Sequence, residues 1–162
     1  MPYLAGSYDY TFKRTIVSSR VDPFRSTLPG STGTLFSMIN YIKLISIPVQ
    51  DQVRALDFYT EKLGFTIITD QPFDEKQRWI ELRIPKADTR VVLFTAEGDE
   101  KRIGSFMPMS YACDDIEQTY KELTGRGVEF EDKPQKQPWG IYAMFKDSEG
   151  NRFVVSQERN GK

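Results

Sequence analysis

The chain has 162 residues, of which 39% are hydrophobic and 28% are charged, and its formal net charge is −1. These values are typical of one globular domain. No apolar run approaches the roughly 20 residues that span a bilayer, and Lys and Arg are spread among Asp and Glu without a basic stripe, which disfavours a nucleic-acid partner. The sequence contains no histidine, which excludes histidine-ligated zinc and any catalytic triad or dyad that uses histidine. Its one cysteine, Cys113, excludes an internal disulfide and favours a reducing, cytoplasmic compartment.

Residues 1–37 differ from the rest of the chain. They are rich in Ser, Thr, Gly, Pro and Arg, and they show no sustained strand or helix period. The segment lacks the apolar stretch of a signal peptide, whereas its basic residues leave a transit peptide as one alternative. We expect an irregular leader. Its expected origin is either cloning or a translation start assigned too far upstream, with Met38 as the natural first residue.

From Met38 onward the pattern predicts regular elements. The apolar and β-branched stretch from Ile39 to Val49 predicts a buried strand. Asp51 can cap a helix that runs to about Leu63, where Gly64 stops it. Three strand-like runs follow before a polar linker, at residues 65–69, 78–84 and 90–95.

The same order of elements then recurs. A strand over residues 107–113 precedes a helix that Asp114 and Asp115 open and that ends at 125–127, and Asp115 follows Asp51 by 64 positions. Three further strands are predicted at residues 128–130, 141–145 and 153–155, with Gly150 in the turn before the last. One β-α-β-β-β unit cannot cover its own sheet, so two must pack together. The sequence therefore predicts an α+β fold in which two units, residues 38–97 and 106–157, form one domain.

Several phrases resemble the vicinal-oxygen-chelate superfamily, which includes glyoxalases, extradiol dioxygenases and bleomycin-resistance proteins. They are VQDQ at 49–52, ALDFY at 55–59, KLGF at 62–65, DDI at 114–116, RGV at 126–128 and DSEGNRF at 147–153. The resemblance covers residues 38 to about 157. It implies paired β-α-β-β-β modules that form a curved mixed sheet around a central cleft.

Metal-using members of that superfamily carry a His or Glu on the first strand of each module and a Glu near each module's last strand. The corresponding positions here are Leu44, Pro108 and Val154, and residues 91–94 contain no carboxylate. None of these side chains offers an oxygen to a cation. The resemblance, combined with this departure, implies a cleft with no metal and no cofactor.

The candidate ligand-binding residues are Trp79, Glu81, Trp139 and Tyr142. Trp79 and Glu81 lie two apart on one predicted strand and therefore share a face. Trp139 is expected to share a face with Ile141, with Tyr142 on the opposite face. Tryptophan walls favour flat aromatic or partly cationic ligands. Core or dimer-interface positions explain both tryptophans equally well, and Glu81 is also consistent with a solvated strand residue.

Three functions follow from these observations. The first is a homodimeric protein that sequesters a small organic ligand without turnover, and that has no nucleic-acid or membrane partner. The alternative is a metal-dependent lyase, isomerase or dioxygenase whose ligands would come from carboxylates such as Glu81, Asp70 or Glu97. The third is a structural or regulatory dimer with no ligand. We favour the binding protein because the metal-ligand positions are apolar.

Overall fold

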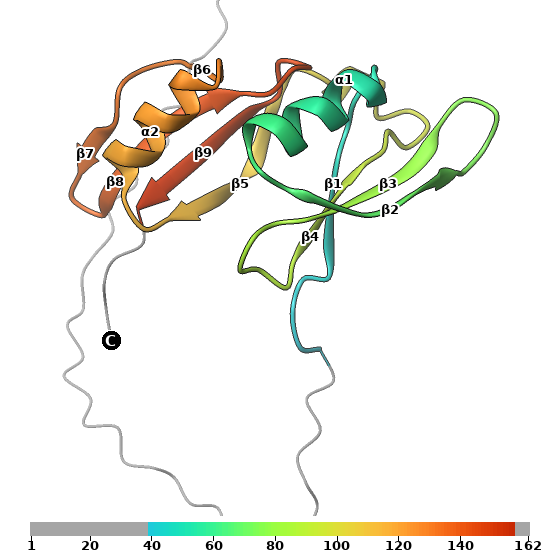
Figure 1. Ribbon diagram of the computed structural model, residues 1–162, viewed down its shortest axis with the longest axis horizontal. Coiled ribbons are helices and arrows are strands. Elements are labelled where there is room, and N and C mark those ends of the chain that lie inside the picture. The colour runs from blue at the N-terminus through green and yellow to red at the C-terminus, as the bar shows by residue number, and fades with distance from the viewer. Residues whose placement is uncertain (1–38, 158–162) are drawn as a thin grey trace, which may run out of the picture. The chain divides into compact units, whose positions relative to one another are not determined.

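The computed structural model of the protein describes residues 39–157 (Figure 1). The leader predicted for residues 1–37 lies outside the described residues. Within residues 39–157, no helix combines the length and the apolar character that crossing a membrane requires. The α+β fold predicted from the sequence is confirmed, and its strands form two separate sheets.

The first sheet has four strands in the order β1-β4-β3-β2, with β1 parallel to β4. Their bounds are β1 (Leu44–Ile47), β2 (Thr66–Pro72), β3 (Arg78–Arg83) and β4 (Arg90–Leu93). β1 is shorter than predicted because its ladder to β4 begins only at Leu44, and residues 39–43 before it are exposed.

The helix of the first unit begins and ends where its local sequence dictates. The Asp51 carboxylate accepts hydrogen bonds from the backbone N–H groups of Val53 and Arg54, at 3.1 and 3.0 Å. α1 (Gln52–Asp57) continues as the π-helical turn η1 (Phe58–Lys62). Gly64 follows with a φ of +74°, a left-handed conformation that favours glycine.

The second sheet has the order β5-β9-β8-β6, with β7 added beside β8. The elements are η2 (Glu100–Arg102) in the linker, β5 (Phe106–Cys113), α2 (Ile116–Gly125), β6 (Glu129–Phe130), β7 (Gln135–Gln137), β8 (Gly140–Lys146) and β9 (Arg152–Gln157). Asp115 caps α2 by accepting from Gln118 N at 3.0 Å. β7 was not predicted, because its three residues are polar and carry no apolar alternation.

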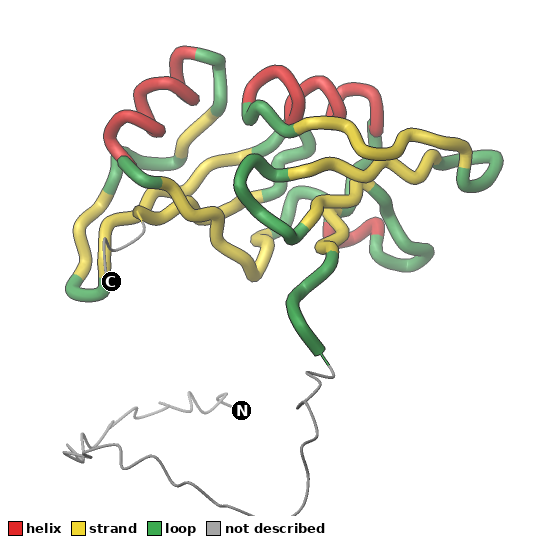
Figure 2. Tube along the Cα trace, turned by 60° about the horizontal axis from the view of Figure 1, so that its bottom comes forward, coloured by secondary structure: helices red, strands yellow, loops and turns green. Residues whose placement is uncertain are grey.

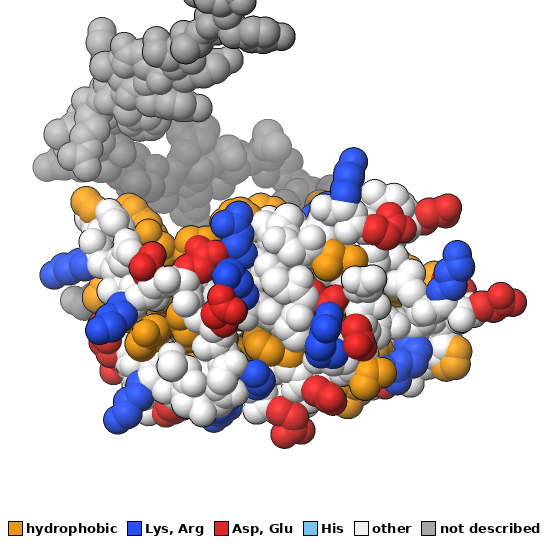
Figure 3. Space-filling view, turned by 90° about the horizontal axis from the view of Figure 1, so that it is seen from above, with side chains coloured by type: hydrophobic (Ala, Val, Ile, Leu, Met, Phe, Trp, Pro, Cys, Tyr) orange, Lys and Arg blue, Asp and Glu red, His pale blue; other side chains and the backbone are white. Residues whose placement is uncertain are grey.

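The two sheets share one hydrophobic core on the side of the helices. In Figures 1 and 2, α1 and α2 lie along the same side of the molecule, with strands beneath them. Figure 3 views the molecule from this side and shows acidic and basic side chains interspersed over it. Ile80 and Leu82 of β3, like Phe153 and Val155 of β9, belong to this core. Because side chains alternate along a strand, residues between them face away from the helices. We call these opposite surfaces the helix-free faces.

The turn between β8 and β9 joins the two units through a buried carboxylate. The Glu149 side chain is 1% exposed and lies at the start of α1. It accepts hydrogen bonds from Gln50 N at 2.7 Å and from the Arg54 guanidinium at 2.6 Å. The carboxylate thereby satisfies backbone donors and the positive end of a helix at once.

Asn151 and Asp147 complete the same joint. Asn151 is fully buried, donates from Nδ2 to the Pro48 carbonyl at 3.0 Å, and accepts from Gly104 N at 2.8 Å. Asp147 accepts the hydroxyl hydrogen of buried Tyr59 at 2.7 Å. The Asp-x-x-Gly-Asn phrase is therefore structural in this protein, since its polar side chains hold one unit to the other.

Candidate functional site

Aromatic residues gather on the helix-free face of the first sheet. Trp79 lies with its ring centroid 5.5 Å from that of Phe94, and Phe73 packs against Phe94 at 4.9 Å. Phe73 is 58% exposed. We call these three residues the Trp79 patch. Trp79 and Phe94 are half-buried beneath Phe73, and an aromatic cluster that reaches the surface in this way is typical of an interaction site.

Glu81 lies beside Trp79 on β3, as predicted, and forms an ion pair with Arg90 of β4. The Oε1–NH1 distance is 2.5 Å and the Glu81 side chain is 12% exposed. The hydrogen bond from Arg90 is the main cause that lowers the pKa of Glu81, against the opposing effect of burial. Glu81 is therefore a fixed carboxylate, and its charge partner is already supplied by the chain.

A second pair of aromatic residues lies on the other sheet. Trp139 stacks on Tyr142 with ring centroids 5.1 Å apart and an interplanar angle of 27°, and Trp139 is 57% exposed. The prediction that Trp139 shares a face with Ile141 and opposes Tyr142 is wrong. Trp139 precedes β8, which starts at Gly140, so the alternation of strand residues does not apply to it. We call this pair the Trp139 patch.

The structure thus places the four predicted ligand-binding residues in two separate pairs. Trp79 lies with Glu81, and Trp139 lies with Tyr142. Among the described residues, no ring contact connects the Trp79 patch with the Trp139 patch. Each patch belongs to the sheet of one unit, and each is open to a molecule that approaches its face.

The positions at which the superfamily holds metal carry only carbon side chains here. Leu44, Pro108 and Val154 alternate with core residues along their strands and so lie on the helix-free faces. Asp70 and Glu81, two of the three carboxylates suggested for the enzyme alternative, are each paired with an arginine. Within residues 39–157, no three His, Cys, Asp or Glu residues converge as a metal site. The side chains that the structure describes at these positions do not fit a metal.

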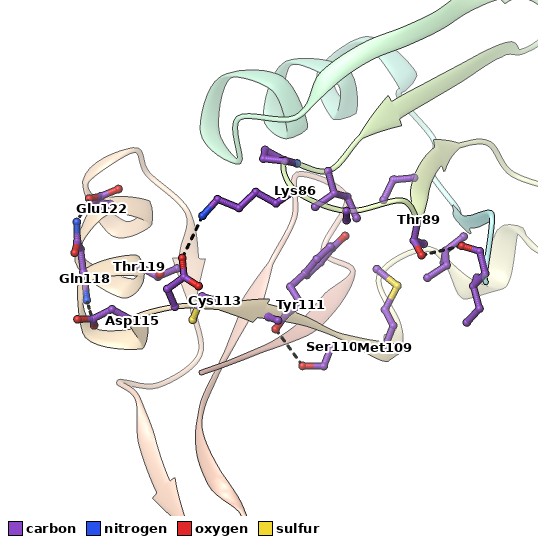
Figure 4. A pocket seen from close by; sticks show the side chains of 18 residues that line it. Lys86, Thr89, Met109, Ser110, Tyr111, Cys113, Asp115, Gln118, Thr119 and Glu122 are labelled. Carbon is purple, nitrogen blue, oxygen red and sulfur yellow. Dashed lines mark hydrogen bonds and ion pairs between the residues drawn. The ribbon is translucent and has the colours of Figure 1, made fainter. Parts of the chain in front are cut away.

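A groove that the sequence did not predict lies between the units on the helix side (Figure 4). Its volume is about 870 Å³, and the loop from β3 to β4 faces β5 and the start of α2 across it. The lining residues with the greatest bearing on its chemistry are Ile45, Ile84, Met109, Tyr111, Cys113 and Asp114. They come from β1, from the β3–β4 loop, and from β5 with the residue after it, and in sequence Met109 and Tyr111 are indistinguishable from ordinary core residues.

Comparison with known proteins agrees with this fold. The glyoxalase/bleomycin resistance protein/dioxygenase superfamily matches residues 39–155. YetH of Bacillus subtilis (strain 168) is 35% identical over 123 residues, which span 74% of this chain and all of YetH.

Solved structures give the same result. A superfamily member from Sphaerobacter thermophilus DSM 20745 is 36% identical with a TM-score of 0.69, over 75% of this chain and 100% of its own. TnmS3, an antibiotic binding protein from Streptomyces sp. CB03234, is 34% identical with a TM-score of 0.68, over 76% of this chain and 100% of its own. The protein belongs to the glyoxalase/bleomycin resistance protein/dioxygenase superfamily.

Proposed function

We propose that this protein is a cytoplasmic binding protein that holds a small organic molecule with a flat aromatic part, without metal and without turnover. The observation that carries the proposal is the exposed Trp139 ring stacked on Tyr142, with the Trp79 patch as its counterpart on the other sheet. The similarity to TnmS3, an antibiotic binding protein, supports a small organic ligand.

The aromatic rings supply most of the affinity in this proposal. A flat ligand that stacks on Trp139 or Trp79 gains about 0.5–1.5 kcal/mol from each ring beyond the burial of apolar area. The Glu81–Arg90 ion pair lies beside the Trp79 patch and orients polar groups of the ligand. Because the pKa of Glu81 is lowered, the group is no proton donor near neutral pH, which agrees with binding without acid catalysis.

A homodimer would complete the site. A ligand laid on either patch leaves its outer surface in water, whereas small-molecule sites bury about 70–90% of the ligand. A second copy that places its helix-free face over the first encloses the ligand between two aromatic surfaces. Phe73 and Phe106, which are 58% and 44% exposed, would be covered in the same step.

The test uses the two tryptophans as reporters, since the chain contains no others. Trp79→Leu leaves Trp139 as the only indole, and Trp139→Leu leaves Trp79. Titration with an anthracycline and a phenazine should quench both single-tryptophan proteins. Each variant should bind about two- to tenfold more weakly than the parent chain, as the loss of one stacking partner predicts.

Val53→Ala is the matched control, because Val53 is 61% exposed on α1, away from both patches. It should bind like the parent chain. Sedimentation with and without ligand measures the dimer in the same samples. Unchanged fluorescence of both tryptophans across the panel would refute the proposal, and so would turnover of a bound ligand.

A further inference from the structure

The groove between the units is a site of a different kind from the two aromatic patches. It lies on the helix side, whereas Trp79, Trp139 and the positions of the superfamily's metal ligands lie on the helix-free faces. Its volume of about 870 Å³ falls within the range of small-molecule pockets, about 300–1,000 Å³. A molecule bound there would not compete with a ligand on either patch.

The internal duplication explains why this groove is open. Glu149 is the third residue after β8, and Lys86 is the third residue after β3. The Glu149 carboxylate inserts at the start of α1 and accepts backbone N–H groups there. A lysine ammonium cannot accept an N–H, and the positive end of α2 repels it. Lys86 instead lies 3.3 Å from Asp114 with both side chains more than 80% exposed, so this joint is left unfilled.

An unpaired hydroxyl lies beside the groove. The Tyr111 ring packs against Phe65 and Phe153 in the core, and Figure 4 shows it pointing from β5 toward the β3–β4 loop. The Tyr111 hydroxyl is buried and has no hydrogen-bond partner among the described residues. Burial raises the pKa of Tyr111 far above its usual range, so the hydroxyl stays a donor. A buried polar group without a partner needs an explanation, and a ligand acceptor would provide one.

The interior and the mouth of the groove differ in character. Ile45, Val91 and Met109 line the interior. The charged residues that line the groove are Asp114, Asp115, Glu122 and Lys86, a net negative set. Such a groove suits a molecule with an apolar body and a protonated amine at one end.

We propose that this groove binds a small amphipathic amine, with its apolar body over Met109, its ammonium group among the carboxylates of the mouth, and an acceptor on the body taking the Tyr111 hydroxyl hydrogen. Cys113 lines the same groove. Burial is the main cause that raises the pKa of its thiol, and Asp114 and Asp115 add to the effect. The thiol is therefore neutral at pH 7, and the binding is non-covalent.

Cys113 also provides the assay, because it is the only cysteine and is part-buried in the groove. The rate at which 4,4′-dithiodipyridine modifies the full-length chain is measured with 4-phenylbutylamine and, separately, with 4-phenylbutyrate. At about ten times its dissociation constant, a ligand leaves about one-tenth of the grooves free, so the amine should slow the reaction about tenfold. The carboxylate should slow it little.

Variants separate the contributions of the mouth and the interior. Asp114→Asn and Glu122→Gln, both at exposed positions, should each weaken protection by about two- to fivefold, as an exposed charge pair predicts. Tyr111→Phe removes a hydroxyl that has no hydrogen-bond partner in the described part of the chain, so it should preserve folding while weakening protection by an amine that carries an ether oxygen, such as 3-phenoxypropylamine. In Trp139→Leu, the amine should protect Cys113 as well as it does in the parent chain.

Two results would overturn the proposal. Equal protection by amine and carboxylate would exclude a cationic ligand, and absence of protection by the amine at millimolar concentration would exclude the site. Quenching of Trp79 or Trp139 without protection of Cys113 would place the amine on the aromatic patches. That result refutes the groove and leaves the proposed function standing.

Discussion

Asn151→Ala tests whether the β8–β9 turn holds the two units together. The substitution removes two hydrogen bonds donated by Nδ2, to the Pro48 carbonyl at 3.0 Å and to Asp147 Oδ2 at 2.9 Å. It also removes the acceptor of Gly104 N. Three bonds at about 1 kcal/mol each, with backbone groups left unpaired in a buried place, predict a loss of about 3–4 kcal/mol in the free energy of unfolding.

Urea denaturation followed by circular dichroism measures this loss, together with a decrease of about 10 °C in the melting temperature. Asn40→Ala is the matched control, because Asn40 is exposed. It should change the free energy of unfolding by less than about 0.5 kcal/mol. A loss below about 1 kcal/mol for Asn151→Ala would refute the role of the turn, since a single exposed hydrogen bond accounts for that much.

Two further predictions concern the same joint and its unfilled counterpart. Burial raises the pKa of Asp147 despite its hydrogen bonds. The contribution of Asp147 to the free energy of unfolding is therefore complete below about pH 4, the pKa in the unfolded chain, and is lost as pH rises through the raised pKa. Asp147→Asn should flatten this decline of stability with pH and cost about 1–3 kcal/mol through lost acceptors, both measured by urea denaturation at several pH values. The triple substitution Lys86→Glu, Asp114→Gln and Gln118→Arg copies the side chains of the β8–β9 joint at the start of α2. It should fill the groove and slow modification of Cys113. Unchanged thiol reactivity in a folded triple variant would contradict this account.

Local signals predicted the helix boundaries and the β8–β9 turn correctly. Asp51 and Asp115 cap their helices, and Gly64 and Gly150 have positive φ, because each of these features depends on residues within a few positions. The boundary of β1 was predicted less well. The apolar pattern from Ile39 continues where no ladder to β4 exists, and pairing is a property of two segments that one segment does not reveal.

The site was harder to predict than the fold. Trp79 and Glu81 share a face as the strand period requires, and the arginine that fixes Glu81 was missed because it comes from the neighbouring strand. Trp139 was assigned to the wrong face because the turn from β7 to β8 ends after it. The groove arises only when the β3–β4 loop meets β5 and α2, so no single stretch of sequence contains a signal for it.

The two duplicated units differ in the charge of one residue at equivalent positions, Glu149 in one and Lys86 in the other. A glutamate after β8 accepts hydrogen bonds at the start of α1, which buries the carboxylate and locks that joint. A lysine after β3 meets the start of α2 and remains in solvent beside Asp114. Helix starts attract anions and repel cations, so the same backbone plan produces a closed joint and an open groove. Beside the open groove, the Tyr111 hydroxyl is buried and has no hydrogen-bond partner within residues 39–157, and the proposed amine site rests on this difference between the two units.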